Sequence, residues 1–169
     1  TGFLPPEESH HAVKVLRLTS GTVITLADGI GNHCQAVLTD ISPNRAAFQI
    51  TGTTHTPQRN FSIHLAIAPT KNIDRIEWLL EKCTEIGVES VTPLLCKASE
   101  RKVVNPDRLE KVIVSALKQS LQAYKPVLHP LTDFSEFVRQ PMLPPQRFIA
   151  HMDTSAQSLT KVALPRMDY

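Results

Sequence analysis

The pattern of apolar residues changes at Phe61, and this change constrains the fold more than any other feature of the chain. Before it, short apolar segments recur about every ten residues and are separated by turn formers such as Asp28-Gly29. Short strands with tight turns at this spacing are typical of a small β-barrel. After it, apolar strands alternate with amphipathic helical segments, which favours a parallel sheet covered on both faces. The sequence therefore predicts two domains, at residues 1–57 and 61–169, joined by a polar linker.

The spacing of apolar residues also predicts individual elements. Strands are expected over 61–68, 91–95, 127–128 and 147–150, and helices over 72–86, 105–121 and 134–138. Gly87 lies where a helix C-cap would fall, and Asn105-Pro106 is a good N-cap and first-turn pair. Near the N-terminus, Ser9 is expected to cap a short helix over 10–16. An open parallel sheet binds its ligand outside the C-terminal ends of its strands, so the loops after the strands are the first places to look for a site.

Composition excludes several classes of protein. The chain has 41% hydrophobic and 20% charged residues, as an ordinary soluble globular protein does. Neither a membrane span nor a signal peptide is evident, so a cytoplasmic protein without membrane contact is expected. Three widely spaced cysteines and seven scattered histidines match no metal-site pattern, so no metal is expected. The net charge is only +2, so any binding of nucleic acid must come from local clusters.

Basic residues follow two of the expected strands. Lys71 and Arg75 flank a strand-to-helix transition, where backbone N–H groups and the helix dipole can meet an anion. Lys97, Arg101 and Lys102 form the densest basic cluster in the chain and follow the next strand. Such residues suit phosphate contact, yet they also occur in ordinary solvated loops and helix starts. The residues alone leave both interpretations open.

Neutral polar groups mark a second candidate region. Gln119-Ser120, near the end of the long expected helix, carry hydrogen-bonding groups suited to a base edge. His151 ends an expected strand, which makes it the one histidine retained as a candidate ligand. The chain has neither a Gly-x-Gly-x-x-Gly fingerprint nor a Walker loop, which argues against the two commonest nucleotide-binding sites.

An ordered series of motifs resembles RsmE-type ribosomal RNA methyltransferases. In the first region, His11-Ala-Val-Lys-Val-Leu-Arg17-Leu, Gly21 and Leu26-Ala-Asp28-Gly29-Ile-Gly31 resemble the N-terminal PUA-like domain of that family. In the second region the family's order is followed by Ala66-Ile-Ala-Pro-Thr-Lys71, Asp74-Arg75-Ile-Glu77, Glu81-Lys82-Cys-Thr84-Glu85-Ile-Gly87-Val88, Pro93-Leu94, Ser99-Glu100-Arg101 and Gln119-Ser120. Each motif is weak alone, but together they cover nearly all of residues 4–130 and form a strong signal.

The resemblance implies a two-domain α+β protein of the SPOUT class. A PUA-like β-barrel would dock RNA, and an α/β parallel-sheet domain would hold S-adenosylmethionine in a C-terminal trefoil knot. Family members methylate N3 of a uridine in 16S ribosomal RNA, in the small subunit, and work as homodimers. The family's Gly-Pro-Glu-Gly-Gly loop and Leu-Arg-x-Glu-Thr segment are absent from this sequence. The domain is therefore expected to be truncated before the knot, with the main cofactor site beyond Tyr169 and His151 the candidate within the chain.

The resemblance also suggests roles for individual residues. Phosphate contacts are expected from Lys71, Arg75, Arg101 and Lys102, further RNA contacts from Lys14, Arg17 and Arg45, and uracil recognition from Gln119 and Ser120. Proton removal is expected either from Glu100 or from a residue beyond Tyr169. Many members carry an arginine shortly after Gln-Ser, where this chain has Gln122, so that arginine's role is not transferred. Two other classes stay open: a non-catalytic RNA-binding module, if the polypeptide ends at Tyr169, and a small-molecule α/β enzyme with an unrelated barrel.

Overall fold

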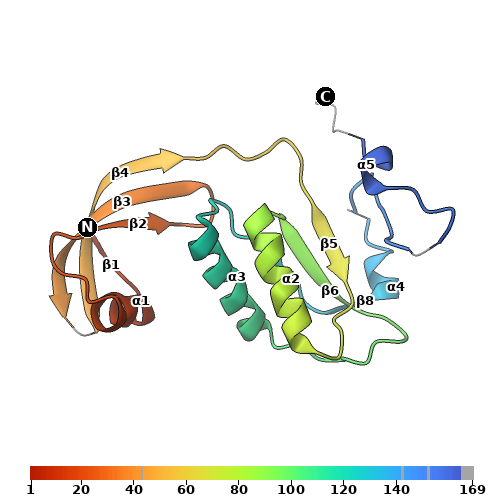
Figure 1. The fold of residues 1–169 in the computed structure, drawn as a ribbon, viewed down its shortest axis with the longest axis horizontal. Helices are drawn as coiled ribbons and strands as arrows, with labels where there is room; N and C mark the ends of the chain where they lie inside the picture. The colour runs from red at the N-terminus through yellow and green to blue at the C-terminus, as the bar shows by residue number, and fades with distance from the viewer. Residues whose placement is uncertain (43, 142, 152, 165–169) are drawn as a thin grey trace. The chain divides into compact units, whose positions relative to one another are not determined.

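The computed structural model describes residues 1–42, 44–141, 143–151 and 153–164, and their packing forms two compact units (Figure 1). The first unit contains Thr1–Gln58 and Ile113–Lys125, and the second contains Arg59–Val112 and the chain from Pro126 onward. Residues 113–125 lie within the second of the two domains expected from the sequence, but by their contacts they group with the first unit. The domain boundary between residues 57 and 61 stays a prediction.

An antiparallel sheet forms the body of the first unit. Its strands follow the order β1-β4-β3-β2, with bounds Gly2–Phe3 (β1), Arg45–His55 (β4), Asn32–Ser42 (β3) and Val23–Ala27 (β2). The β3–β4 hairpin changes register at two places, and irregularities of this kind bend and twist a sheet. Ala36, Leu38 and Ala46 are fully buried and form the centre of its core. The β-rich N-terminal domain expected from the evenly spaced apolar segments is thus confirmed, in the form of an antiparallel sheet.

The helical segment near the N-terminus differs from the expectation. Helix α1 (Pro6–His10) continues into a π-helical turn, η1 (His11–Val15), so Ser9 lies inside the helix and its prediction as an N-cap is wrong. Proline at the first helical position starts the helix earlier, because its fixed φ suits that position. The buried Ser9 hydroxyl instead donates to Leu4 O at 3.0 Å and accepts from Ala46 N at 3.1 Å. It therefore joins the helix to β4.

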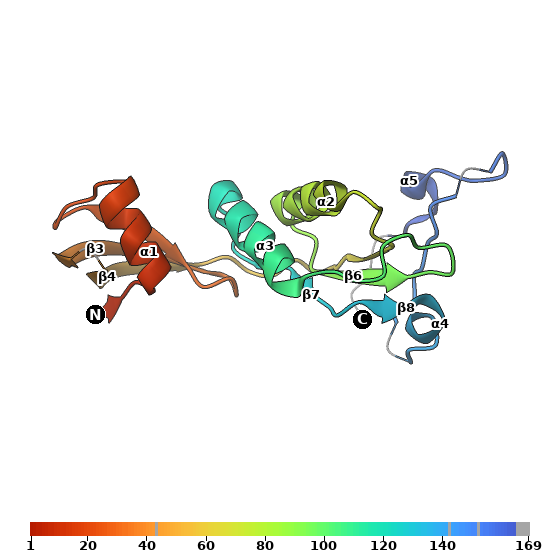
Figure 2. The ribbon, with the colours of Figure 1, turned by 90° about the horizontal axis from the view of Figure 1, so that it is seen from below.

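A parallel sheet forms the body of the second unit. Its strands follow the order β5-β6-β7, with bounds His64–Ile67 (β5), Ser90–Leu95 (β6) and Val127–Leu128 (β7), and β8 (Thr132–Asp133) also pairs with β6. Helices α2 (Ile73–Ile86), α3 (Pro106–Ser120) and α4 (Phe134–Phe137) connect or follow these strands. In Figure 2, α2 and α4 lie on opposite sides of β6. These elements confirm the parallel sheet and the helices that apolar spacing predicted; β8 was not anticipated.

Local chemistry at the helix ends explains where α2 and α3 begin and end. Asn72 caps α2 by accepting a hydrogen bond from Asp74 N at 2.9 Å. Gly87 ends it in the left-handed conformation with φ of 77°, as predicted. Asn105 caps α3 by accepting from Arg108 N at 3.1 Å. Apolar stripes complete both helices, with Ile76, Leu80 and Cys83 buried in α2 and Leu109, Ile113 and Ala116 buried in α3.

The strand expected over 147–150 is wrong. This stretch has no regular secondary structure, and Phe148 and Ile149 are 48% and 83% exposed. An apolar run becomes a strand only where a neighbouring strand takes up its backbone hydrogen bonds, and no described strand pairs with this one. Further along, a single helical turn, α5 (Leu159–Val162), was not predicted. None of the helices in the described parts of the chain is long and apolar enough to cross a membrane.

The segment that follows α3 pairs with the turn between β2 and β3. Gly31 N donates to Ala123 O at 2.9 Å, and Lys125 N donates to Gly29 O at 2.8 Å. Gly31 has φ of 109°, and a Cβ placed on it would lie 2.5 Å from the Tyr124 hydroxyl oxygen. Only glycine fits such a close approach in this conformation. These contacts explain why the segment after α3 groups with the first unit.

Candidate functional site

Two loops of the second unit leave the same edge of its parallel sheet. Ile67 at the end of β5 is paired with Pro93 in β6, so the chain after each strand emerges at the C-terminal edge. Thr70 and Lys71 follow β5, and Arg101 lies in the loop after β6. The edge that parallel-sheet topology favours for ligand binding therefore carries the basic residues that the sequence singled out.

Arg101 fastens the two loops together. Its Nε donates to Thr70 O at 3.2 Å, and its Nη2 donates to Lys71 O at 2.6 Å. A guanidinium has five N–H donors, so two of them hold the loop after β5, and the other three donate to no described residue and could bind an anion. Arg101 thus has a structural role in placing Lys71 in addition to the phosphate contact that the sequence suggested.

Hydrogen bonds within each loop fix the same edge further. The Thr70 hydroxyl donates to Asn72 O at 2.9 Å, next to the α2 cap. After β6, Cys96 N donates to the Ser99 hydroxyl oxygen at 2.9 Å, and Ser99 N donates back to Cys96 O at 2.9 Å. The loops are therefore held in shape by their own bonds, which lowers the entropy cost of binding a ligand there.

Nearby acidic side chains are paired elsewhere. Arg108 at the start of α3 donates from Nη2 to Glu77 Oε2 at 3.0 Å and lies 3.9 Å from Asp74 Oδ1. The hydrogen bond to Glu77, followed by the charges of Glu77 and Asp74, raises the pKa of Arg108. Because Arg108 balances these carboxylates, the positive charges of Lys71 and Arg75 are less offset at the strand-end edge.

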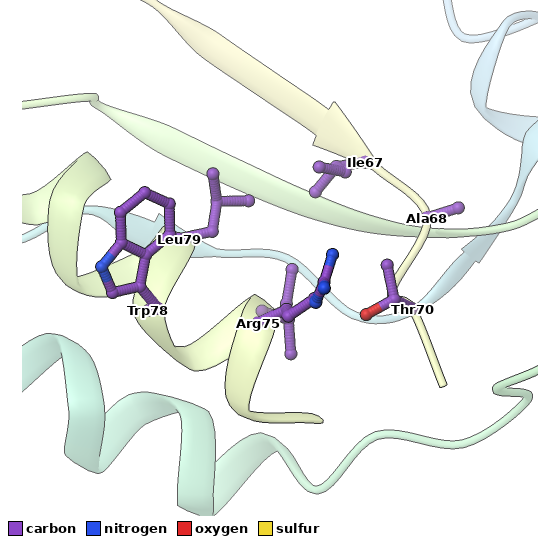
Figure 3. Close-up of a pocket in the computed structure, with 7 residues that line it drawn as sticks. Ile67, Ala68, Thr70, Arg75, Trp78 and Leu79 are labelled. Carbon is purple, nitrogen blue, oxygen red and sulfur yellow. The ribbon is translucent and has the colours of Figure 1, made fainter. Parts of the chain in front are cut away.

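A pocket of about 320 Å³ adjoins this edge (Figure 3). It is lined by Ile67, Ala68, Thr70, Arg75, Ile76, Trp78 and Leu79. In Figure 3 the Arg75 side chain extends from α2 toward the end of β5 that carries Ile67 and Thr70. Trp78, the single tryptophan of the chain, is 61% exposed. The pocket is thus mainly apolar, with one guanidinium and one hydroxyl at its polar end.

The pocket does not fit S-adenosylmethionine, the cofactor that the resemblance implied. That molecule needs polar partners for its adenine, its ribose hydroxyls and its amino-acid carboxylate. Among the described residues that line the pocket, polar side-chain atoms come only from Thr70, Arg75 and the indole N–H of Trp78. His151, the candidate within the chain, is exposed and follows no strand, so the premise behind its selection is absent. Its cofactor-binding role stays a prediction.

The other residues predicted for the site take no part in the Arg101 hydrogen bonds. Glu100 and Lys102 flank Arg101 and are exposed. Gln119 is exposed at the end of α3, and the Ser120 hydroxyl donates to Ala116 O at 2.7 Å. Gln119 and Ser120 belong to the first unit, whereas the strand-end edge belongs to the second. The structure therefore brings Lys71, Arg75 and Arg101 to one edge of the second unit, and the predicted contact of Gln119 and Ser120 with uracil stays a prediction.

The basic residues predicted in the first unit lie on separate elements. Lys14 is exposed in η1, and Arg17 is exposed beyond it with the unusual φ of 53°. Arg45 begins β4, and its guanidinium carbon lies 3.8 Å from the centroid of the Phe3 ring. No described ion pair or hydrogen bond links these three side chains. Their role in RNA contact stays a prediction.

Sequence reasoning missed a histidine pair on the second sheet. The rings of His64 and His129 have centroids 5.3 Å apart, and the Phe137 ring meets His64 edge-on at 5.6 Å. His64 Nε2 lies 2.7 Å from the Thr92 hydroxyl oxygen. Burial, and to a lesser degree the charge of His129, lowers the pKa of His64. His64 lies in β5 and His129 directly follows β7, the two strands that flank β6, so the pair depends on a strand order that no local signal in the sequence reveals.

Comparisons with known proteins point in one direction. The family described as RNA methyltransferase domain matches residues 57–167, and the family described as RNA methyltransferase PUA domain matches residues 4–51. The Ribosomal RNA small subunit methyltransferase E of Rickettsia conorii is 23% identical over 131 residues, which cover 78% of this chain and 53% of the relative. The chain thus spans about half the length of that relative.

Solved structures agree with these matches. A protein from Porphyromonas gingivalis assigned as an rRNA-methyltransferase is 33% identical with a TM-score of 0.74, over 83% of this chain and 60% of that one. The Ribosomal RNA small subunit methyltransferase E of Neisseria gonorrhoeae, solved with bound S-adenosyl methionine, is 25% identical with a TM-score of 0.70, over 83% and 60% of the two chains. Because the first family match covers well over half of its residues, this chain belongs to the RNA methyltransferase family.

Proposed function

We propose that this protein transfers a methyl group from S-adenosylmethionine to N3 of a uridine in 16S ribosomal RNA. Its membership of the RNA methyltransferase family supports a methyl-transfer reaction on RNA. The names of the Rickettsia and Neisseria relatives support small-subunit ribosomal RNA as the substrate. The S-adenosyl methionine bound in the Neisseria structure supports that molecule as the cofactor. The observation that carries the proposal is the match of residues 57–167 to this family, on a unit whose strand-end edge gathers three basic residues.

In the proposal, this edge holds the RNA backbone. Arg101 keeps the loop after β5 in place, so that Lys71 projects from a fixed backbone rather than from a mobile loop. The remaining N–H groups of Arg101 and the charge of Arg75 then contact phosphate oxygens. Exposed Lys102 adds charge beside them. Holding the substrate in one orientation is the main requirement, since bringing N3 in line with the donor methyl group lowers the barrier by positioning.

Recognition of the uracil falls to Gln119 and Ser120 in this proposal. The Ser120 hydroxyl hydrogen is used by Ala116 O, so its oxygen is left to accept a hydrogen bond, as a uracil N3–H group requires. Exposed Gln119 offers both a donor and an acceptor. Exposed Glu100 is the proposed general base for the N3 proton. When bound, S-adenosylmethionine supplies a methyl group already activated by its sulfonium, and His151 is the proposed cofactor contact within this chain.

The first unit is proposed to dock the RNA. Lys14, Arg17 and Arg45 supply its basic side chains, and turning a base out of a folded RNA costs a few kcal/mol that such contacts help to offset. In this proposal the reaction takes place in the cytoplasm, and the enzyme acts as a homodimer. Sedimentation of the full-length protein would show the dimer.

Methyl transfer to unmodified RNA tests this function directly. The full-length protein would be incubated with S-adenosylmethionine carrying a tritiated methyl group and with small ribosomal subunits from cells that lack the mark. We expect label in 16S RNA, recovered as 3-methyluridine after digestion to nucleosides. Subunits that already carry the mark are the matched control and should take up little label. Absence of incorporation, or label in a nucleoside other than 3-methyluridine, would contradict the proposal.

A further inference from the structure

An aromatic ring and a guanidinium are stacked at the edge of the first unit's sheet. Phe3, in β1, is 53% exposed, and the guanidinium carbon of exposed Arg45 lies 3.8 Å from its ring centroid. This is a cation–π contact. A phenylalanine this exposed contributes little to the core, because half of its surface stays in water. The flat cationic group of Arg45 lies over its ring.

Backbone pairing holds both members of the stack in place. Phe3 is paired with Ala47 across β1 and β4. Arg45 is paired with Ser42 at the start of the β3–β4 hairpin, and its carbonyl oxygen accepts the Ser42 hydroxyl at 3.1 Å. The ring and the guanidinium thus project from two adjacent, hydrogen-bonded strands. Such support reduces the entropy lost when a ligand binds.

The charge of Arg45 is not neutralised within the described residues. No described carboxylate forms an ion pair with it, although exposed Asp40 lies nearby in the sequence. Glu8, on the helix that packs against β4, is paired with Lys118 instead. Arg45 therefore keeps both its charge and its planar face for a partner outside this chain.

We propose that Phe3 and Arg45 form a stacking platform for an unpaired nucleobase of the bound RNA. Proteins read single-stranded RNA by stacking bases on aromatic rings and arginine planes, while a base inside a duplex has no free face to offer. A guanidinium already supported by a ring presents its other face to a base, and its charge attracts the adjoining phosphate. The inference rests on the proposed function in RNA methylation, and it assigns Arg45 to base stacking rather than to phosphate contact alone.

Two probes separate stacking from charge. One is a short fluorescently labelled oligouridylate, and the other is a ribose-phosphate oligomer of the same length without bases. In Arg45→Lys the charge remains but the planar face is lost. In Phe3→Leu the apolar contact of β1 remains but the ring is lost. Arg147→Lys, at an exposed arginine of the second unit, is the matched control. Binding of the full chain to both probes would be followed by fluorescence anisotropy at one salt concentration.

The platform predicts a selective loss of affinity. Arg45→Lys and Phe3→Leu should each weaken oligouridylate binding about tenfold, the size expected for one stacked base, and should leave binding of the baseless oligomer unchanged. Arg147→Lys should change neither. Equal weakening for both probes, or no weakening for either, would show that Arg45 contacts only phosphate or nothing, and the platform would be overturned. If the wild-type chain bound neither oligouridylate nor small-subunit RNA, the RNA function itself would fail, which is a separate result.

Discussion

The two units place their basic residues in different ways. In the first unit, the hairpins of β2, β3 and β4 join segments that follow one another in sequence, and Lys14, Arg17 and Arg45 stay on separate elements. In the second unit, parallel pairing of β5 with β6 brings loops thirty residues apart to one edge, where Arg101 bonds the backbone at Thr70 and Lys71. The crossover connection between parallel strands thus brings distant basic residues to one edge, whereas the hairpins leave the basic residues of the first unit on separate elements. Four predictions test this difference.

The largest effect is expected from a cavity in either core. Leu80 in α2 and Leu38 in β3 are 1% and 0% exposed, and replacing either by alanine should lower the free energy of unfolding by about 3 to 4 kcal/mol. Hydrogen exchange should show Leu80→Ala loosening β5, β6 and α2, and Leu38→Ala loosening β3 and β4. Leu159→Ala, at a residue 58% exposed, is the control and should change stability by less than about 0.5 kcal/mol. The comparison of two units fails if both core variants loosen the same amides.

Glycine substitutions in the first unit should form a graded series. Gly31→Ala should cost about 2 to 3 kcal/mol, because its φ is 109° and the new Cβ would lie 2.5 Å from the Tyr124 hydroxyl oxygen. Gly21→Ala, with φ of 86° and open space, should cost about 1 kcal/mol for the backbone alone. Gly52→Ala meets nothing within 4 Å and is the control, with a change below about 0.5 kcal/mol. Denaturant titration would rank them; equal costs would show that the Tyr124 contact is unimportant.

Alanine variants at Arg101 and Lys102 should distinguish the loop-holding role of Arg101 from the contribution of positive charge at the strand-end edge. Arg101→Ala removes two hydrogen bonds to the loop after β5 and should lower stability by about 1 kcal/mol. Lys102→Ala removes the same charge from an exposed side chain and should leave stability unchanged. Both should weaken RNA binding, but Arg101→Ala more strongly, because it also removes the hydrogen bond that holds the backbone of Lys71 in place. Thermal melts with RNA titrations would measure this, and equal RNA losses would argue against the loop-holding role.

The smallest effect is a pH dependence from the histidine pair. The pKa of His64 lies below the ordinary value of 6.5, chiefly through burial and then through the charge of His129; its other ring and hydroxyl neighbours, Phe137 and Thr92, do not titrate in this range. The unfolded chain therefore binds the proton more readily, and stability falls as pH drops from about 6.5 through the lowered pKa. His129→Gln should reduce this loss. Urea midpoints from about pH 8 to about pH 5 would measure it, and an unchanged slope would remove the pair as its cause.

Most of the fold follows from periodicity and caps. The helical stripe of α2 and its ends at Asn72 and Gly87 were visible in the sequence, because each signal is local and the signals agree. The strand expected over 147–150 was wrong because a strand needs a partner, and pairing is not a local property. The N-cap prediction for Ser9 was wrong for a similar reason. Its hydroxyl bonds Leu4 O and Ala46 N, and Ala46 lies in β4, thirty-seven residues away in the sequence.

The candidate site was predictable in position but not in detail. Lys71, Arg75 and Arg101 could be placed at one edge, since the C-terminal ends of parallel strands meet there. The use of Arg101 to hold backbone carbonyl oxygens could not be foreseen, because it depends on the distance between two loops. The stack of Arg45 on Phe3 was equally hidden, as it requires the pairing of β1 with β4.

The salt dependence of RNA binding tests the central claim, that the strand-end edge of the second unit contacts RNA phosphates. Affinity of a small-subunit RNA fragment would be measured at several salt concentrations for the wild type and for a Lys71→Gln, Arg75→Gln double variant, which leaves the Arg101 hydrogen bonds to the backbone intact. The account predicts weaker binding and a salt slope smaller by about 0.7 to 0.9 for each lost phosphate contact. Unchanged affinity and slope would contradict it.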